Sequence, residues 1–278
     1  DVGITVLLAI IGVIITAILV VKNVKGNILW GILITWVLGI ICQLTGVYVP
    51  NAELGFYNLL PDFSNGISIP SLAPVFCKMN FSGILSLNFI VVIFSFLFVD
   101  LFDTIGTLIG VSSKAGMLDE NGKLPRIKGA LLADAVATTA GAALGTSTTT
   151  TFVESASGVS EGGRTGLTSV TTAVLFGLSL LLSPIFLAIP SFATAPALII
   201  VGFYMLTNVV NIDFSDYTEG FPAFMTILMM VVCYSISEGL VFGVISYVLL
   251  KLFGGKKNEL NPVIVIIAIL FFLKLILG

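Results

Sequence analysis

Residues 146–166 read TSTTTTFVESASGVSEGGRTG, a segment rich in Ser, Thr and Gly that also carries carboxylates. It interrupts a chain of 278 residues that is 57% hydrophobic and only 10% charged, with a mean hydropathy of +1.14. Inside a membrane, irregular backbone is tolerated only where it is buried in protein or lines a cavity. We therefore interpret this segment as the floor of a substrate site near the middle of a membrane.

The composition of the chain indicates a membrane protein and argues against nucleic-acid binding and a metal site. Soluble domains carry roughly 25% charged residues, so the deficit predicts an all-α polytopic protein that crosses the cell membrane several times and contacts lipid. The net charge of −3 argues against nucleic acid as a partner, because nucleic acid requires a basic face. The chain has no histidine and its three cysteines are scattered, so we expect no metal site.

The apolar runs predict the membrane spans. A spanning helix needs about 20 apolar residues, and runs of this kind occupy 4–21, 28–46, 83–111, 127–145, 167–189 and 194–210. The run 221–253 would be roughly 50 Å long as one helix at 1.5 Å per residue. Because SISEG at 235–239 interrupts it, we expect two short helices that meet near the midplane. The run 263–277 contains Lys274, and its position, across the membrane or at the interface, is left open.

Basic residues in short loops predict the orientation. They lie in three loops, and counting crossings places all three on the cytoplasmic side: Lys22 and Lys25; Lys114, Lys123, Arg126 and Lys128; and Lys251, Lys256 and Lys257. The count requires that 146–164 also crosses, as an extended piece followed by a short helix. The connection 47–82, rich in Pro, Gly, Asn and Ser, predicts a boundary between two packing units.

Two carboxylates lie on one face of the span 83–111. Asp100 and Asp103 are three residues apart, and Thr107 follows Asp103 by four, which makes one polar stripe on an apolar helix. A carboxylate in hydrocarbon costs about 2.5–3.5 kcal/mol on insertion scales, so this pair requires polar partners or a wet cavity. We expect Asp103 to face a ligand and Asp100 to support it, and helix–helix hydrogen bonds remain the alternative.

The hydroxyl run 147–151 is rich in β-branched residues, which favours an extended conformation. Thr151 followed by Glu154 fits a capping box, so we expect a short helix to begin here with its positive end toward the cavity. Glu154 then either only closes its own capping box or binds substrate. A carboxylate sequestered from water can exchange a proton as its surroundings change, which would couple substrate movement to protons.

Other polar residues near these spans have structural interpretations. Asp134 lies in a helix of small residues and is expected to bond to a neighbouring helix. Glu161 and Arg164 are expected to form a mutual pair or to anchor a helix end. Phe152, next to the break, is a candidate stacking surface for a ring.

Three segments resemble a known family. They are FVDLFDTIGTLIG (98–110), GALLADAVATTAGAALGTSTTTTFVESASGVSEGGRTGL (129–167) and YSISEGLVFGVISYVLLKL (234–252). They resemble the AzgA-like branch of the nucleobase–cation symporter 2 superfamily, which are permeases for adenine, guanine and hypoxanthine. The resemblance implies fourteen membrane segments in two inverted repeats of seven, with a core and a gate domain and a short strand plus half-helix at the midplane. It also implies that segments six to fourteen are represented and that one to five are absent from the sequence.

The resemblance also implies a domain plan and a site. Residues 1–50 and 191–256 would be gate helices, 51–82 an extramembrane connection, 83–190 the core domain with the site, and 257–278 a C-terminal apolar segment. Asp103 and Glu154 would bind a purine base and carry the coupling proton, with no other cofactor. Further substrate contacts are assigned to Thr149, Thr150, Thr151, Phe152 and Ser155, and support to Asp100, Thr107, Asp134 and Arg164. A homodimer is one expected assembly.

Three alternatives remain beside proton-driven import of purines. Uracil and xanthine members of the superfamily place Glu where Asp103 stands and Asn where Ser155 stands, which favours the purine branch. An anion transporter of the same architecture is disfavoured by the negative charge of Glu154. An intramembrane aspartyl protease would also need two carboxylates, and Pro196-Ala197-Leu198 matches part of its motif, but its Tyr-Asp and Gly-x-Gly-Asp pair is absent.

Overall fold

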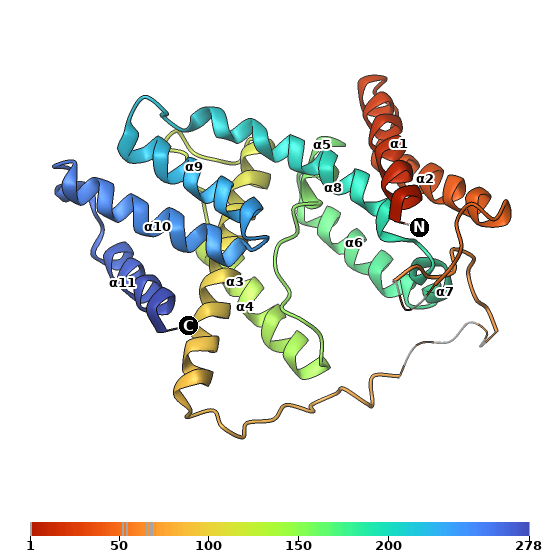
Figure 1. Cartoon of the computed structure of the whole chain (residues 1–278), viewed down its shortest axis with the longest axis horizontal. Coiled ribbons are helices and arrows are strands. Elements are labelled where there is room, and N and C mark those ends of the chain that lie inside the picture. Colours follow the sequence, from red (N-terminus) through yellow and green to blue (C-terminus); the bar gives the residue numbers. More distant parts are fainter. Residues whose placement is uncertain are drawn as a thin grey trace. The chain divides into compact units, whose positions relative to one another are not determined.

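The computed structural model describes residues 2–51, 53, 55–64, 66, 69 and 71–277, and every regular element in this part of the chain is a helix (Figure 1). The one β feature of the described residues is an isolated bridge between Asn51 and Phe56, so the predicted all-α class is confirmed. The elements are α1 (Val2–Val21), α2 (Asn27–Leu44), α3 (Leu87–Lys114), α4 (Ile127–Leu144), α5 (Ser155–Ser160), α6 (Gly166–Ser179), α7 (Ser183–Leu187), α8 (Ser191–Leu206), η2 (Thr207–Asn211), α9 (Tyr217–Val232), α10 (Ile236–Phe253), η3 (Lys257–Glu259) and α11 (Pro262–Leu277).

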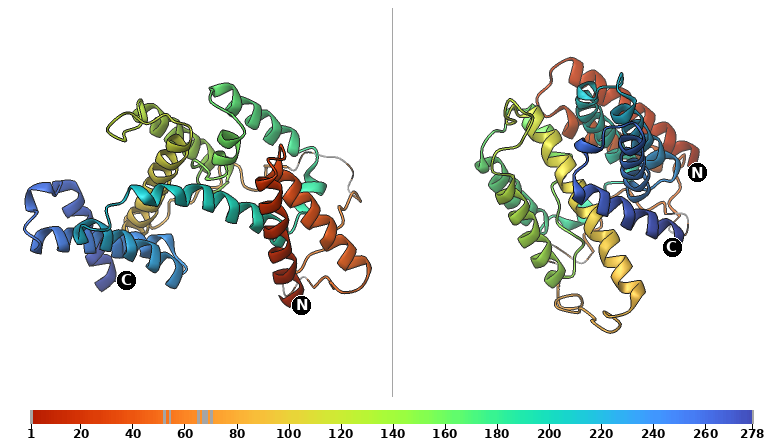
Figure 2. Two further views of the ribbon diagram at one scale, coloured as in Figure 1. Left: turned by 90° about the horizontal axis from the view of Figure 1, so that it is seen from above. Right: turned by 90° about the vertical axis from the view of Figure 1, so that its left-hand side faces the viewer.

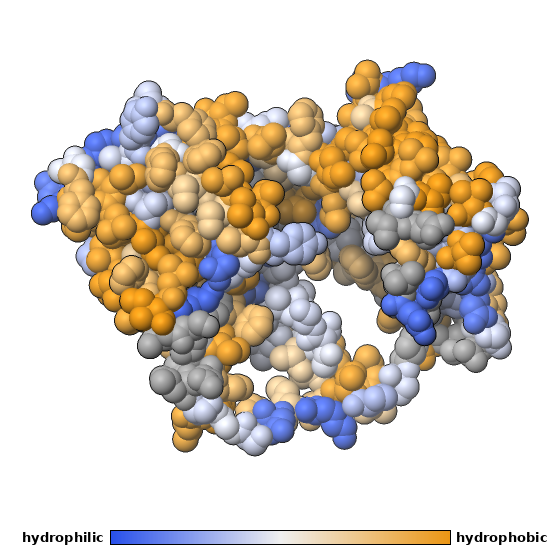
Figure 3. All heavy atoms as spheres, viewed as in Figure 1, coloured by the Kyte–Doolittle hydropathy of each residue, from blue (hydrophilic) through white to orange (hydrophobic). Residues whose placement is uncertain are grey.

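Six helices among the described residues are long and apolar enough to cross a membrane. At most 28% of the apolar window of any of them is buried, so most of their hydrophobic surface faces outward. Figure 3 shows the same feature, because hydrophobic side chains cover large areas of the visible face. Soluble proteins rarely expose apolar patches of this extent, so the surface agrees with a protein surrounded by lipid or by further helices.

The chain forms two compact units, which we describe one at a time. The first contains Asp1–Lys78, Thr107–Ser147 and Thr151–Leu206. The second contains Met79–Gly106, Thr148–Thr150 and Thr207–Gly278. The predicted division into gate and core domains stays a prediction.

Close packing of α1 against α2 in the first unit depends on glycine. Thr16 of α1 lies over Gly31 of α2, where an added Cβ would come within 2.1 Å of the threonine hydroxyl oxygen. Thr35 lies in the same way over Gly12, at 2.6 Å. Each hydroxyl donates to a carbonyl of its own helix at 2.7 Å, Thr16 to Gly12 and Thr35 to Gly31. Small residues let membrane helices approach closely, and here the two contacts interlock.

The beginning of the 47–82 connection packs against α2 in this unit. Trp36 donates from its indole nitrogen to the carbonyl of Leu59 at 3.0 Å, and Gln43 accepts from the Leu59 amide at 2.8 Å. Tyr48 is 2% exposed and donates its hydroxyl to the carbonyl of Tyr57 at 2.9 Å. These bonds satisfy buried polar groups where the chain leaves the helix.

The prediction of one span over 167–189 is wrong. The chain forms α6, which ends at Ser179, and then the short α7, which begins at Ser183. Pro184 stands at the start of α7. Proline has no amide hydrogen for an i−4 bond and disfavours helical geometry in the residue before it, so the chain turns there.

The predicted break within 221–253 is confirmed, because α9 ends at Val232 and α10 begins at Ile236, and its expected position near the midplane stays a prediction. Helices α9 and α10 pack side by side as an antiparallel hairpin (Figures 1 and 2). Tyr234 has a φ of 51°, a left-handed conformation that reverses the chain between them. The hairpin is close packed, because a Cβ on Gly243 would lie 1.9 Å from the Thr226 hydroxyl oxygen.

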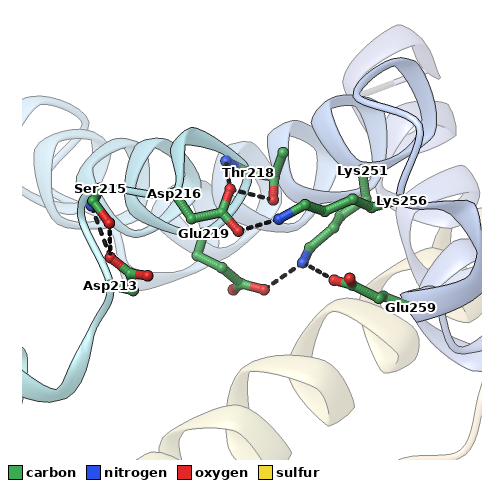
Figure 4. Close-up of polar contacts among 8 residues, drawn as sticks. All are labelled: Asp213, Ser215, Asp216, Thr218, Glu219, Lys251, Lys256 and Glu259. Atoms are coloured by element: carbon green, nitrogen blue, oxygen red, sulfur yellow. Dashed lines mark hydrogen bonds and ion pairs between the residues drawn. The ribbon is translucent and has the colours of Figure 1, made fainter.

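A buried lysine joins α9, α10 and the turn that follows them (Figure 4). Lys251 is 1% exposed, and its ammonium lies 2.5 Å from carboxylate oxygens of both Glu219 and Glu259. Lys256 pairs with Asp216, whose other oxygen accepts from the Thr218 amide and so caps α9. A buried cation is costly unless it is paired and hydrogen-bonded, and this cluster meets that requirement.

Helix α11 packs along α10. Lys274 donates to Glu238 at 2.9 Å and to the Ser237 hydroxyl at 3.0 Å, near the start of α10. Glu259 joins the opposite end of α10, through Lys251, to the turn before α11. These contacts favour packing of α11 beside α10 over a separate position of α11 at the membrane interface. They also pair the Lys274 ammonium with the Glu238 carboxylate.

The interlocked glycines generate a stability prediction. Replacing Gly31 by Ala should lower the melting temperature of the purified protein in detergent, because overpacking costs about 1–3 kcal/mol. Gly202→Ala is the matched control, since a Cβ at that helical position meets nothing within 4 Å. Equal melting temperatures of the two variants would contradict the packing described for α1 and α2.

The Lys256 ammonium and the amide and hydroxyl of Thr218 hold the pKa of Asp216 well below its ordinary value of 3.8. A depressed folded-state pKa means that the contribution of Asp216 to stability is complete above pH 3.8 and is lost as the pH falls below it. The melting temperature of Asp216→Asn should therefore lie below that of the wild type at about pH 6 and converge with it toward about pH 2. A constant difference between the two proteins over this range would contradict the prediction.

Candidate functional site

The segment that precedes α5 differs from its prediction. Residues 146–152 have no regular secondary structure, and no strand is assigned there. A strand needs a neighbouring backbone to bond with, whereas two of these threonines bond through their side chains to α3. The predicted short strand is therefore absent from the structure.

The predicted capping box is also wrong. Helix α5 begins at Ser155, and Glu154 occupies the N-cap position without a side-chain capping bond. The amides of Ser155 and Ala156 donate to Phe152 and Val153 at 3.1 and 3.0 Å, which makes a tight turn before the helix. This turn separates Glu154 from a cap at Thr151. The carboxylate is consequently available for another role.

Within the second unit, α3 binds the threonine segment by two side-chain hydrogen bonds. Thr148 donates its hydroxyl to Asp100 at 2.6 Å. The hydroxyl oxygens of Thr104 and Thr150 lie 2.7 Å apart, and Thr104 is fully buried. Asp100 thus has a polar partner in the threonine segment, and its supporting role beside Asp103 stays a prediction. Thr104 was missed by sequence reasoning, although its position four residues after Asp100 places it on the same helix face.

Asp103 lies between Asp100 and Thr104 on α3 but forms no hydrogen bond to the threonine segment among the described residues. It is half-buried, and the hydrogen bonds and ion pairs of the described residues do not involve its carboxylate. Glu154 belongs to the first unit and is exposed there, and its sequestration from water in the substrate site stays a prediction. Each acid is thus available to a ligand, and their mutual arrangement stays a prediction.

The remaining predicted contact residues lie in varied surroundings. Phe152 is 55% exposed, which leaves its ring accessible for stacking, and Ser155 is exposed. Thr151 is half-buried, and Thr149 has a polar interaction of its own. Thr107 is 4% exposed, which fits a structural role on α3. Asp134 also has a polar interaction.

Glu161 and Arg164, the two charged residues that follow α5, form hydrogen bonds to different parts of the first unit. Arg164 donates to the carbonyls of Val159 and Gly163 at 2.5 and 2.8 Å, which confirms the helix-end anchor. A cation at this end also suits the helix dipole. Glu161 instead accepts from the amide of Gly26 at 3.1 Å, so the predicted mutual pair with Arg164 is wrong.

The bond between Glu161 and Gly26 lies beside a polar pocket of the first unit. The pocket has a volume of about 220 Å³ and is lined by Lys25, Asn27, Ser160, Glu161 and Tyr204, with the neighbouring residues of the α1–α2 loop. The Lys114 ammonium lies 5.3 Å from the centre of the Tyr204 ring, a cation–π distance. In the described part of the chain, no cluster of three or more His, Cys, Asp or Glu residues could hold a metal ion.

Comparison with known proteins defines the class of this chain. Residues 1–242 match the Permease family. The chain is 42% identical to the adenine permease AdeP of Escherichia coli, over 98% of this chain and 58% of that protein. It is 43% and 42% identical to the guanine/hypoxanthine permeases PbuO and PbuG of Bacillus subtilis, over 97% and 98% of this chain and 60% and 59% of those proteins. The chain thus spans about three fifths of the length of these relatives.

The chain belongs to the Permease family. The predicted resemblance to AzgA-like purine permeases is confirmed by these relatives. The relatives compared are named as permeases, which favours a transporter over an intramembrane protease. The family and the six apolar spans together define a multi-pass membrane protein.

Proposed function

We propose that the protein containing this sequence is a secondary active transporter that imports purine nucleobases, such as adenine, guanine or hypoxanthine, together with protons. The observation that carries this proposal is the Asp103 carboxylate on α3, which has no protein partner among the described residues although it lies between two residues that do. A carboxylate in an apolar helix is expensive unless it has a role. The names of the relatives supply the substrate class.

A purine base suits the chemistry of these residues. Its ring and exocyclic N–H groups are donors, and the carboxylates of Asp103 and Glu154 are acceptors. The hydroxyls of Thr149, Thr150 and Thr151 and that of Ser155 can donate or accept, and so can satisfy the remaining polar edge of the ring. The exposed ring of Phe152 offers a face on which a flat heterocycle can stack.

Coupling to protons follows from the cost of charge in a dry site. An empty, closed site would leave a carboxylate charged and unpaired, which is unfavourable in low dielectric. Taking up a proton removes that cost, and binding of a base restores a partner. We assign this exchange to Asp103 and Glu154, with no other cofactor.

Alternating access would arise from movement of gate helices against a core. We propose that 83–190 belongs to the core and that 1–50 and 191–256 belong to the gate, in a fold of two inverted seven-segment repeats. Residues 51–82 would be the extramembrane connection and 257–278 a C-terminal apolar segment. We propose a homodimer embedded in the cell membrane as the assembly.

The site assignment is tested by uptake of labelled adenine, guanine and hypoxanthine into cells that express the protein containing this sequence. Glu154→Ala should abolish uptake while the protein still reaches the membrane, because one of two acceptors for the ring is lost. Full uptake by this variant would remove Glu154 from the site.

The roles of the aspartates are separated by a matched pair of variants. Asp103→Asn should raise KM for uptake more than Asp134→Asn does, because an amide replaces a carboxylate that contacts the base. The reverse order would show that the contact and structural roles are interchanged.

The coupling ion is tested separately with a proton uncoupler. Accumulation of purine against its gradient should be lost when the uncoupler is added, while exchange of labelled for unlabelled base across the membrane continues. Accumulation that survives the uncoupler and follows a sodium gradient would show that sodium, not the proton, is the coupling ion.

A further inference from the structure

We propose that residues 72–78, which we call the strap, bind reversibly to the C-terminal end of α4 and control movement of the chain that follows this helix. The strap docks where α4 ends and the threonine segment, residues 146–152, begins. It releases when that segment moves during transport. This inference rests on the proposed transport function and goes beyond it, because it gives a role to the 47–82 connection, which contains none of the proposed substrate contacts.

The strap is a compact turn that is held by its own backbone. The amides of Val75 and Phe76 both donate to the carbonyl of Leu72, at 3.0 and 2.9 Å, and the amide of Lys78 donates to that of Val75 at 3.3 Å. Pro74 lies in this turn, and its fixed φ favours turns. All residues of the strap are exposed. The strap therefore has a shape of its own and depends on few contacts with the rest of the first unit.

A backbone hydrogen bond docks the strap on α4 within the first unit. The last carbonyls of a helix have no partner inside that helix. The amides of the two residues after α4 bond to the carbonyls of Ala142 and Gly141, which closes the helix end. The carbonyl of Ala143 instead accepts from the amide of Cys77, at 2.8 Å. The strap thus supplies a hydrogen-bond partner from a distant part of the sequence.

Close packing at Gly145 fixes the docked position of the strap. Gly145 caps the C-terminus of α4 in a left-handed conformation, with a φ of 78°. An added Cβ would lie 2.6 Å from the Val75 Cβ and 2.7 Å from the Val75 carbonyl oxygen, so the strap backbone passes directly over the glycine. Gly145 also immediately precedes the threonine segment. Displacement of the start of that segment therefore displaces the surface on which the strap packs.

The backbone of Cys77 favours release of the strap. Its φ is 52°, in the left-handed region that residues with a Cβ rarely adopt. Such a conformation persists only where surrounding contacts hold it. Here the contacts are one hydrogen bond to Ala143 and the packing of Val75 on Gly145. The docked state is thus balanced between a few contacts and a backbone cost, as a reversible contact requires.

The connection that carries the strap is also fixed near its beginning. Trp36 and Gln43 of α2 form hydrogen bonds to the backbone of Leu59. The connection therefore joins the end of α2 to the end of α4 inside the first unit. In the proposed domain plan α2 belongs to the gate and α4 to the core. Movement of one against the other then requires that the strap release.

Two substitutions of Cys77 should shift the docking equilibrium in opposite directions. Cys77→Gly keeps the amide and removes the cost of the left-handed backbone, whereas Cys77→Pro removes the amide and excludes a positive φ. Trypsin cleavage after Lys78 is measured on the purified protein containing this sequence, relative to the same protein denatured. Cys77→Pro should accelerate cleavage by about tenfold, as expected for loss of one hydrogen bond, and Cys77→Gly should slow it. Equal relative rates in the three proteins would disprove docking.

The contact at Gly145 is tested with a control that carries the same backbone cost. Gly145→Ala should accelerate hydrogen exchange of the amides of residues 75–78. Gly116 also has a positive φ, of 67°, but a Cβ there meets nothing within 4 Å. Gly116→Ala should therefore leave exchange in the strap unchanged. The same exchange rates in both variants would show that Gly145 does not seat the strap.

The link to transport is tested by adding adenine, guanine or hypoxanthine at a concentration that saturates uptake. A bound base should slow exchange at residues 75–78, because it holds the threonine segment and with it the seat of the strap. Cys77→Gly should also lower the maximal rate of uptake, since a more firmly docked strap releases less often. Exchange that is unchanged or faster with purine, or a wild-type uptake rate in Cys77→Gly, would overturn the proposal.

Failure of the proposed function gives a different result. A wild-type protein that takes up no purine, while the Cys77 and Gly145 variants change cleavage and exchange as expected, would refute purine transport. Docking of the strap on α4 would still be supported, because neither cleavage nor exchange depends on a substrate.

Discussion

The constraint on which this structure depends is that a chain in hydrocarbon must satisfy its polar groups from within. The threonine segment is held in this way, since Asp100 and Thr104 receive its side chains on α3. Lys251 is satisfied by two glutamates, and Lys274 by Glu238. A carboxylate that lacks such a partner then stands out, and among the described acids of α3 this is Asp103.

This constraint also explains why the contact and support roles fall on one helix. The same span that presents the proposed ligand acid also supplies the bonds that hold the unwound segment beside it. A substitution that disturbs one is expected to disturb the other, because both use the same few turns of backbone. The α5 end is secured differently, by Arg164 to its own carbonyls and by Glu161 to the loop before α2.

Much of the helical layout could be predicted from the sequence, because the apolar runs and the break before Glu238 are local signals. Pro184 indicates the division between Ser179 and Ser183, whereas the length of the apolar run 167–189 favours a single span. The start of α5 was not readable, because Thr-x-x-Glu satisfies a capping pattern even when a turn intervenes. The bond from Gly26 to Glu161 joins residues 135 positions apart, and no local pattern predicts such a contact.

The candidate site divides in the same way. The acids and the threonine run could be predicted because polar residues are rare in this chain. The hydrogen-bond partners of Thr148 and Thr150 on α3 could be identified only from the structure. The helical repeat places Thr104 on the same face as Asp100, but nothing in the sequence distinguishes it from other hydroxyl residues of the span. Chemistry that depends on residue type was thus predictable, and the choice between neighbouring threonines was not.

The glycine–threonine contacts have a mechanical consequence. Helices α1 and α2 cannot slide along each other unless the Thr35 and Thr16 side chains move away from Gly12 and Gly31, against which they pack. The α9–α10 hairpin has a contact of the same kind, between Thr226 and Gly243. Each helix pair should therefore move as a rigid body, so that in the proposed transport cycle any bending would occur in the linkers outside these pairs.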